Sequence, residues 1–194
     1  MRHIPTRIIG LVGLPGAGKT TIAKYLEKKR FTHVILSDFI KVEASKSGIV
    51  DFTREILQDY GNKMREQFGP QILAQLALKK IRSDKITKVV IDGVRNPYEV
   101  AFLKVENNFT LIGVAARPQV RYKRLVERKT RSWNGSFHEF LKQEHREESL
   151  GSAQIGLRVS QCLKEADYII QNNSSIDSLY KATEAVLLLK KSTQ

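Results

Sequence analysis

An octet near the start of the chain, Gly13–Thr20, constrains the fold more than any other part of the sequence. It runs Gly-Leu-Pro-Gly-Ala-Gly-Lys-Thr and fits G-x-x-x-x-G-K-[ST], the pattern of a phosphate-binding P-loop. The apolar run before it is typical of a buried strand over 7–13, and the residues after it predict a helix over 19–30. A structural glycine-rich turn is the alternative, but these flanks favour a loop whose amides converge on phosphate oxygens.

The residue types within the octet have separate chemical tasks. Lys19 has the length to reach the β- and γ-phosphates of a nucleotide, and Thr20 offers a hydroxyl to Mg²⁺. The expected donor is ATP with Mg²⁺, although the sequence does not distinguish ATP from other nucleoside triphosphates. We expect the donor to contact Gly13, Pro15, Gly16, Ala17, Gly18, Lys19, Thr20 and Thr21.

Composition is that of an ordinary globular domain. The chain has 194 residues, 41% of them hydrophobic and 27% charged, which suits one domain with a substantial core. No apolar stretch approaches the ~18 residues of a membrane span, and the first residues lack an apolar signal core. The lone Cys162 excludes an internal disulfide and suits a reducing compartment. We therefore expect a cytoplasmic protein without a membrane partner.

Basic residues outnumber acidic ones, which gives a formal charge of +13 and predicts affinity for polyanions. Between Arg117 and Arg131 there are seven basic residues and one acid. The arginines of this segment follow i+3/i+4 spacing and would repel one another on a helix without a nearby anion, for which the triphosphate is the obvious candidate. A solvated helix face is the alternative. The stripe consists of Arg117, Arg121, Arg124, Arg128 and Arg131.

Strand-like and helix-like segments alternate along the chain, which predicts an α/β fold with a mainly parallel sheet. The predicted strands are rich in Val, Ile and Leu with little alternation, as expected when both faces are covered. They lie at 7–13, 33–37, 87–92, 109–115 and 167–171. Besides 19–30, helices are predicted over 97–105, 118–130, 138–149, 153–165 and 176–191.

Residues 38–82 form a mostly helical excursion between the second and third predicted strands. Because Gly48, Gly61 and Gly69-Pro70 punctuate it, we expect three helices. A simple crossover needs only about a dozen residues, so this segment should do more than connect strands. Its cations best placed to reach a second phosphorylated substrate are Lys41, Arg54 and Arg65, although a surface position without a role is equally open for each.

Two acids stand where predicted strands end. Asp92 closes the third strand, at the edge of a parallel sheet where ligands bind, so we expect it to hold Mg²⁺ directly or through water. After it, Gly93 would permit close approach of phosphate and Arg95 would clamp it. Asp38 follows the second strand and is predicted to face substrate. Capping of the next helix is the alternative for both acids.

The histidines show no spacing typical of a metal site together with the cysteine. We expect all four to be structural or exposed; they are His3, His33, His138 and His145.

Taken in order, five motifs resemble a known family: G-L-P-G-A-G-K-T, L-S-D-F, V-V-I-D-G-V-R-N-P-Y-E-V, R-Y-K-R-L-V-E-R and E-A-D-Y-I-I-Q-N. The chain resembles P-loop nucleoside monophosphate kinases, closest to adenylate-kinase-related and dephospho-CoA-kinase-like proteins of archaea and bacteria. The resemblance runs from Ile8 to about Leu189. It implies a three-layer P-loop NTPase fold with a five-stranded parallel core, a helical acceptor-binding insertion and a short arginine-rich lid.

The resemblance also implies boundaries within a single domain over 1–194. The core takes 1–37, 83–131 and 150–194, the acceptor-binding insertion takes 38–82, and the lid takes 131–149.

Roles follow for single residues by position. Asp38 resembles the acid beside the acceptor nucleotide, and Arg95 resembles the arginine that holds the acceptor phosphate, although D-G-V-R is one residue shorter than the family motif. Arg124 and Arg128 resemble the paired lid arginines, with Arg131 nearby. Asn172 follows the last strand, where the family places a loop near the adenine.

Departures from the family leave the acceptor open. Ser37 stands where adenylate kinases have glycine, and Lys41 where many have arginine. Leu36 replaces the first acid of the D-x-D that dephospho-CoA kinases show, which favours a phosphate acceptor over a ribose hydroxyl that needs a general base. We predict transfer of the γ-phosphoryl group of ATP to a nucleoside monophosphate. Two alternatives remain: a dephospho-CoA kinase, and a nucleotide-binding regulator or RNA-associated ATPase. A nucleic-acid partner is possible but not favoured, and the oligomeric state is open.

Overall fold

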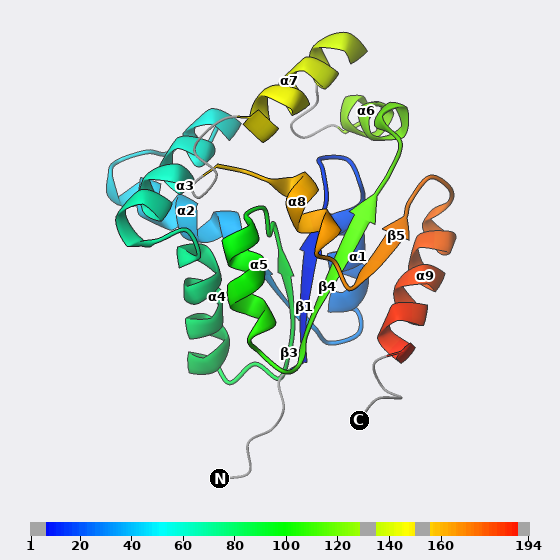
Figure 1. The fold of residues 1–194 in the computed structure, drawn as a ribbon, viewed down its shortest axis with the longest axis horizontal. Helices are drawn as coiled ribbons and strands as arrows, with labels where there is room; N and C mark the ends of the chain where they lie inside the picture. Colours follow the sequence, from blue (N-terminus) through cyan, green and yellow to red (C-terminus); the bar gives the residue numbers. More distant parts are fainter. Residues whose placement is uncertain (1–6, 129–134, 150–155, 190–194) are drawn as a thin grey trace.

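The fold is taken from a computed structural model, which describes residues 7–128, 135–149 and 156–189. For Arg54 and for 146–149 only the backbone is described. Figure 1 shows a sheet with helices on both faces and two further helices above its upper edge. Among the described residues, no helix has the length and apolar character needed to span a membrane.

Five parallel strands form the centre of the molecule in the spatial order β2-β3-β1-β4-β5. This arrangement confirms the predicted parallel α/β core. Strand ends differ from the prediction by a few residues, most clearly at β2. That strand stops at Ile35 because buried Leu36 already belongs to the next helix. The strands are β1 (Arg7–Val12), β2 (Thr32–Ile35), β3 (Lys88–Asp92), β4 (Phe109–Ala115) and β5 (Tyr168–Gln171).

Each face of the sheet has its own hydrophobic core. On one face lie α1 (Lys19–Glu27) and α9 (Ile176–Leu189), packed over Ile9, Leu11 and Ile112. On the other lie α4 (Ile72–Ser83), α5 (Pro97–Lys104) and α8 (Val159–Lys164), with core residues such as Ile91 and Leu111. Because both faces are covered, the strands carry apolar residues without alternation. The sandwich therefore fixes the strand ends rigidly at both edges.

The excursion after β2 forms three helices, as predicted: α2 (Leu36–Lys46), α3 (Arg54–Phe68) and α4. One predicted break is wrong, because Gly61 lies inside α3. A Cβ at this position would lie 3.0 Å from Ile40 Cδ1, so glycine lets α2 and α3 pack closely. Gly61 therefore serves helix packing.

Two helices stand above the carboxyl edge of the sheet, α6 (Pro118–Val126) and α7 (Phe137–Ser149) (Figure 1). Tyr122 of α6 packs edge-on against Phe137 of α7, with ring centroids 5.4 Å apart. The predicted helix over 118–130 ends at 126, and the segment 129–134 lies outside the described residues. From the predicted helix over 153–165 the described part contains α8 alone.

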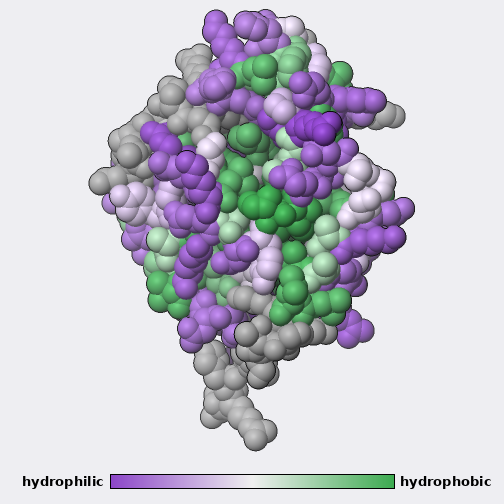
Figure 2. Space-filling view, turned by 45° about the vertical axis from the view of Figure 1, so that its right-hand side comes forward, coloured by the Kyte–Doolittle hydropathy of each residue, from purple (hydrophilic) through white to green (hydrophobic). Residues whose placement is uncertain are grey.

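Strand β5 and helix α9 expose several apolar side chains. Figure 2, which brings this side of the molecule forward, shows hydrophobic residues across the middle and hydrophilic ones around the top. Ile169 of β5 is 47% exposed, and Leu188 and Leu189 of α9 are similarly open. The carboxyl edge of the sheet is instead surrounded by charged side chains of α6 and α7.

Candidate active site

The predicted phosphate-binding loop joins β1 to α1 at the carboxyl edge of the sheet. Three of its glycines have a positive φ: 154° at Gly13, 77° at Gly16 and 112° at Gly18. A Cβ at Gly13 would overlap the carbonyl oxygen of Val114 in β4, so the loop lies directly against the sheet. Gly18 precedes α1 and offers no side-chain cap, which leaves the first amides of the helix available to an anion.

Lys19 lies across this loop. Its Nζ donates to the carbonyl oxygens of Gly13, at 2.6 Å, and Leu14, at 3.3 Å. Thr20 is exposed in the first turn of α1, and Thr21 is half-buried behind it. A cation above the loop and an exposed hydroxyl beside it fit the predicted donor site.

Side chains from α6 contact the loop from above. Arg121 Nη1 donates to the carbonyl oxygen of Pro15 at 3.4 Å, and Arg124 Nη1 donates to that of Gly16 at 3.4 Å. Burial and the neighbouring Arg128 lower the pKa of Arg124. A polyanion between these two guanidiniums would relieve their repulsion. Arg128 itself is exposed just after α6, and Arg131 lies outside the described residues.

Asn172 holds the loop in place. Its Nδ2 donates to the carbonyl oxygen of Ala17 at 2.8 Å, and its Oδ1 accepts from Arg124 Nη2 at 3.2 Å. The residue is buried, so its amide is committed to the loop and to α6. The sequence predicted a position near the adenine; the structure shows a link between β5, the loop and α6.

The arginine stripe carries an unexpected anion. Arg121 is buried and pairs with Glu144 of α7, with 2.9 Å between Nη2 and Oε2. Triphosphate was the anion expected to balance the stripe, but at Arg121 a carboxylate of the chain itself does so. This pair joins α7 to the helix that contacts the loop.

Asp92 ends β3 within reach of the same loop. It is only 7% exposed, and it does not cap α5, because Asn96 does so. Burial alone would raise the pKa of Asp92, but His33, Lys19 and Arg95 together hold it below its usual value. An ionised carboxylate oxygen is the kind of ligand that a divalent cation takes in proteins.

His33 is the residue of this edge that the sequence did not single out. It lies on β2, with Nε2 3.7 Å from Asp92 Oδ2 and Nδ1 3.6 Å from Glu27 Oε1. Those separations exceed a hydrogen bond, so the contact is mainly electrostatic. The Asp92 carboxylate raises the pKa of His33, although burial opposes the shift. Pairing of β2 with β3 brings the two together, which no spacing in the sequence indicates.

We expect His33→Gln to flatten the pH dependence of stability. Because the pKa of His33 is raised in the folded protein, its protonated form stabilises the fold below the ordinary histidine pKa of about 6.5. That contribution is lost as pH rises through the folded pKa. In Mg²⁺-free urea unfolding, wild type should exceed the variant at about pH 5.5 and match it more closely at about pH 8.5. A difference equal at both values, or one shared by exposed His145→Gln, would contradict this.

The residues predicted to face an acceptor lie in the first turn of α2 and after β3. Asp38 is exposed and pairs with Lys41 at 2.6 Å. Ile35 is the N-cap of α2, so the capping alternative for Asp38 is wrong. Arg54 begins α3, and its side chain is outside the described part.

Arg65 has a structural partner. It is 4% exposed, and its Nε and Nη2 donate to Glu99 Oε1 at 3.3 and 2.9 Å. Oε2 of the same carboxylate accepts from the backbone N–H groups of Arg95 and Asn96. The expected contact with a second substrate is therefore corrected: Arg65 fixes the turn between β3 and α5, because a buried guanidinium requires an internal anion.

That turn is joined by its backbone to the segment before α8. Gly93 and Arg95 are half-buried after Asp92, and the carbonyl oxygen of Arg95 accepts from Arg158 N at 2.9 Å. Arg158 precedes α8 and was missed because it lies 63 positions along the chain from its neighbour. Asn96 Nδ2 joins the same two segments of the chain by donating to the Gly156 carbonyl oxygen at 3.0 Å.

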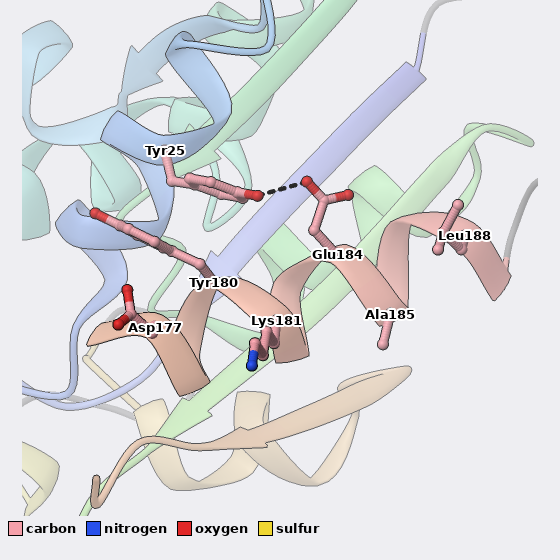
Figure 3. A pocket seen from close by; sticks show the side chains of 7 residues that line it. All are labelled: Tyr25, Asp177, Tyr180, Lys181, Glu184, Ala185 and Leu188. Carbon is pink, nitrogen blue, oxygen red and sulfur yellow. Dashed lines mark hydrogen bonds between the residues drawn. The ribbon is translucent and has the colours of Figure 1, made fainter. Parts of the chain in front are cut away.

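A separate surface pocket of about 500 Å³ opens between α1 and α9 (Figure 3). Tyr25 and Tyr180 stack there with centroids 4.3 Å apart, and the Tyr25 hydroxyl donates to Glu184. None of its lining residues belongs to the loop, so it is distinct from the donor site. Among the described residues, no group of three or more His, Cys, Asp or Glu side chains could hold a metal ion.

The parallel sheet, the glycine loop and the strand-end carboxylate define a P-loop protein with a kinase-like α/β fold, and residues 9–150 match the AAA domain family. The chain belongs to the UPF0200 family. It is 32% identical to the UPF0200 protein of Pyrococcus horikoshii over 185 residues, which cover 93% of this chain and 95% of the relative.

Solved structures share the fold at low sequence identity. TT1252 from Thermus thermophilus superposes with a TM-score of 0.63 at 19% identity, covering 94% of this chain and 97% of that one. Shikimate kinase from Bacteroides thetaiotaomicron gives 0.57 at 16% identity, covering 93% and 98%. The arrangement of sheet, loop and helices is thus that of P-loop kinases.

Proposed function

We propose that the protein is an ATP- and Mg²⁺-dependent phosphotransferase that moves the γ-phosphoryl group to a small nucleoside monophosphate-type acceptor. The observation that carries this is the meeting of Lys19, Asp92 and Arg124 at one edge of the sheet. Lys19 spans the loop, its charge lowers the pKa of Asp92, and Arg124 donates to the loop from the opposite side. Phosphoryl transfer depends mainly on such placed charges.

On the donor side, the amides of the loop would bind the α- and β-phosphates, and Lys19 would exchange its loop carbonyls for β- and γ-phosphate oxygens. Thr20 and Asp92 are the residues that would hold Mg²⁺, and the ion when bound neutralises charge on the phosphates. The low pKa of Asp92 keeps it ionised at neutral pH, as a cation ligand requires.

Arg124 and Arg128 would stabilise the transferring group. Arg124 is half-buried against the loop, and Arg128 lies exposed at the end of the same helix. Burial and, after it, repulsion from Arg128 lower the pKa of Arg124, and an anion between the two guanidiniums would relieve that repulsion. Arg131 would extend this group. The Arg121–Glu144 pair attaches α7 to these residues, so movement of α7 would change how they meet the donor.

On the acceptor side, the charge of Arg95 acts on Asp92, a backbone bond joins Arg95 to Arg158, and the Asp38–Lys41 pair lies at the start of α2. The Arg95 guanidinium suits an acceptor with a phosphate or another anionic group. Asp38 is paired with a cation, and Leu36 is buried, so neither supplies a free general base for a ribose hydroxyl. This supports a phosphate acceptor over dephospho-CoA.

An acceptor panel tests this assignment. Purified protein with ATP, Mg²⁺ and AMP, CMP, GMP, UMP or dephospho-CoA should form a nucleoside diphosphate from at least one monophosphate, detected by chromatography. Arg95→Ala should raise KM for that acceptor on the order of tenfold, with KM for ATP unchanged. Lys63→Gln on the exposed face of α3 is the matched control and should change neither. Turnover of dephospho-CoA alone would overturn the choice of acceptor.

A further inference from the structure

Four cations gather at the amino edge of the sheet, opposite the phosphate-binding loop. We call Lys28, Arg30, Lys85 and Lys88 the amino-edge patch. Segments 28–30 and 79–88, which contain them, hold eight cations and one acid. The first segment links α1 to β2 and the second ends α4 and leads into β3. Because Thr32 pairs with Val89 in these neighbouring strands, the two connections lie side by side.

The charges of the patch are available to a partner. All four side chains are exposed, and no carboxylate of the described residues pairs with any of them. Of the other four cations in these segments, Lys29 pairs with Glu184, Lys80 with Asp84 and Arg82 with Glu106, and Lys79 is exposed on α4. Lys80 also lowers the pKa of Asp84, the only acid of the two segments. The patch is therefore a local excess of positive charge.

Two patch residues adopt a backbone conformation that favours glycine. Arg30 has a φ of 65° and Lys85 a φ of 53°, and no other non-glycine residue of the described part has a positive φ. Each lies just beyond a helix whose end is closed by a backbone bond, Phe31 N to Leu26 O and Ile86 N to Ile81 O. Glycine is the usual residue there.

Interaction with the helix dipoles does not explain why arginine and lysine stand at these two positions. A cation in the last turn of a helix serves the dipole without any backbone strain. Placing arginine and lysine at these two glycine-type positions costs stability, and neither side chain forms a hydrogen bond or ion pair within the described residues. Strain of this kind is found where a site has a function.

We propose that the amino-edge patch binds the phosphate backbone of a nucleic acid without regard to sequence. Lysines and arginines that contact phosphates supply such binding. None of the elements beside the patch, α1, β2, α4 or β3, exposes a large hydrophobic side chain for insertion into a lipid surface. The patch lies at the other end of the strands from the loop, so bound nucleic acid leaves the nucleotide site open. The inference therefore does not depend on the proposed phosphotransfer.

The double variant Arg30→Gly/Lys85→Gly tests the patch, because it removes two charges while relieving the strained backbone. Its melting temperature should equal or exceed that of wild type, so lost binding cannot come from misfolding. The control Lys63→Gln/Lys181→Gln removes the same charge from exposed positions of α3 and α9. The probe is a fluorescein-labelled RNA of about 20 nucleotides, titrated from about 50 to about 200 mM salt.

Wild type and control should bind the RNA with similar affinity and a steep salt dependence. The glycine variant should bind about tenfold more weakly, and its slope of log K against log salt should be smaller by about 1.4, since each single-strand phosphate contact contributes about 0.7. Lys19→Ala should bind RNA as wild type does, which separates this outcome from failure of the proposed function. Equal weakening in both double variants would overturn the proposal.

A second binding experiment, with phospholipid vesicles, tests an anionic membrane as the alternative ligand of the patch. Leu188 and Leu189 are exposed at the end of α9, which also points toward the amino edge. Binding to phosphatidylserine-containing vesicles but not to RNA, lost in the glycine variant, would overturn the assignment of the patch to nucleic acid.

Discussion

Lys19→Ala is expected to lower kcat/KM for ATP by on the order of 10²–10³-fold, the effect of removing one placed charge or donor from a transferring group. Lys19 is the cation that spans the loop, with Nζ 2.6 Å from the Gly13 carbonyl oxygen. Without it, the phosphates lose their main positive partner, and Asp92 loses one of the charges that lower its pKa. Titration with a fluorescent ATP analogue and steady-state kinetics measure the two effects.

Lys24→Ala is the matched control for this variant. Lys24 is exposed on the same helix, one turn further on, and its replacement removes the same charge from α1. Saturating ATP should raise the melting temperature of wild type and of Lys24→Ala, because a ligand that binds only the folded state stabilises it. Lys19→Ala should show little shift. Equal ATP stabilisation of all three proteins would contradict the donor site placed here.

Gly13→Ala is expected to destabilise the fold by about 3–5 kcal/mol, or to prevent folding. At a φ of 154° the new Cβ would overlap the carbonyl oxygen of Val114, and neither β1 nor β4 can move without breaking their pairing. Backbone strain and overlap therefore add. Urea unfolding followed by circular dichroism measures the loss.

Gly48→Ala separates the two contributions. Gly48 has a φ of 78°, but no atom lies within 4 Å of the position that a Cβ would take. The added methyl group would therefore strain the backbone without overlapping a neighbouring atom. It should cost about 1 kcal/mol. A Gly13→Ala variant no less stable than Gly48→Ala would show that the loop does not lie against β4 as described.

The sequence correctly predicted those features of the fold that depend on residues close together in the chain. The loop octet, the apolar strands and the acid at the end of β3 each depend on residues close together in the chain, and the structure places the loop and the acid at the carboxyl edge of the sheet. The predicted strand over 33–37 runs two residues past the observed end of β2 at Ile35, because the burial of Leu36 in the next helix depends on packing against α4 and the sheet. Gly61 was misjudged for the same reason, since its role is a helix contact.

The charged side chains of the site were predicted less well, because their partners are distant in sequence. Arg65 is buried because it pairs with Glu99, which lies 34 positions away in the chain. Asn172 donates a hydrogen bond to the carbonyl oxygen of Ala17, 155 positions away, and Arg121 donates to Glu144 of the next helix. Charge alone does not show whether a cation faces a ligand or a buried carboxylate.

Two residues that matter at this edge had no signal at all. His33 is a single histidine in a short strand, and only the β2–β3 pairing places it beside Asp92. Arg158 lies shortly after a segment outside the described residues, and only a backbone bond to Arg95 joins it to the turn after β3. Strand order and loop paths of this kind follow from the tertiary fold.

The fate of the γ-phosphoryl group tests the central claim most directly. ATP labelled at that group, incubated with the protein, Mg²⁺ and a mixture of nucleoside monophosphates, should transfer its label to a nucleotide product. Formation of ADP should rise severalfold when the acceptors are added, because the acceptor is the intended nucleophile. Label appearing only as inorganic phosphate, at one rate with or without acceptors, would contradict a phosphotransferase and favour an ATPase.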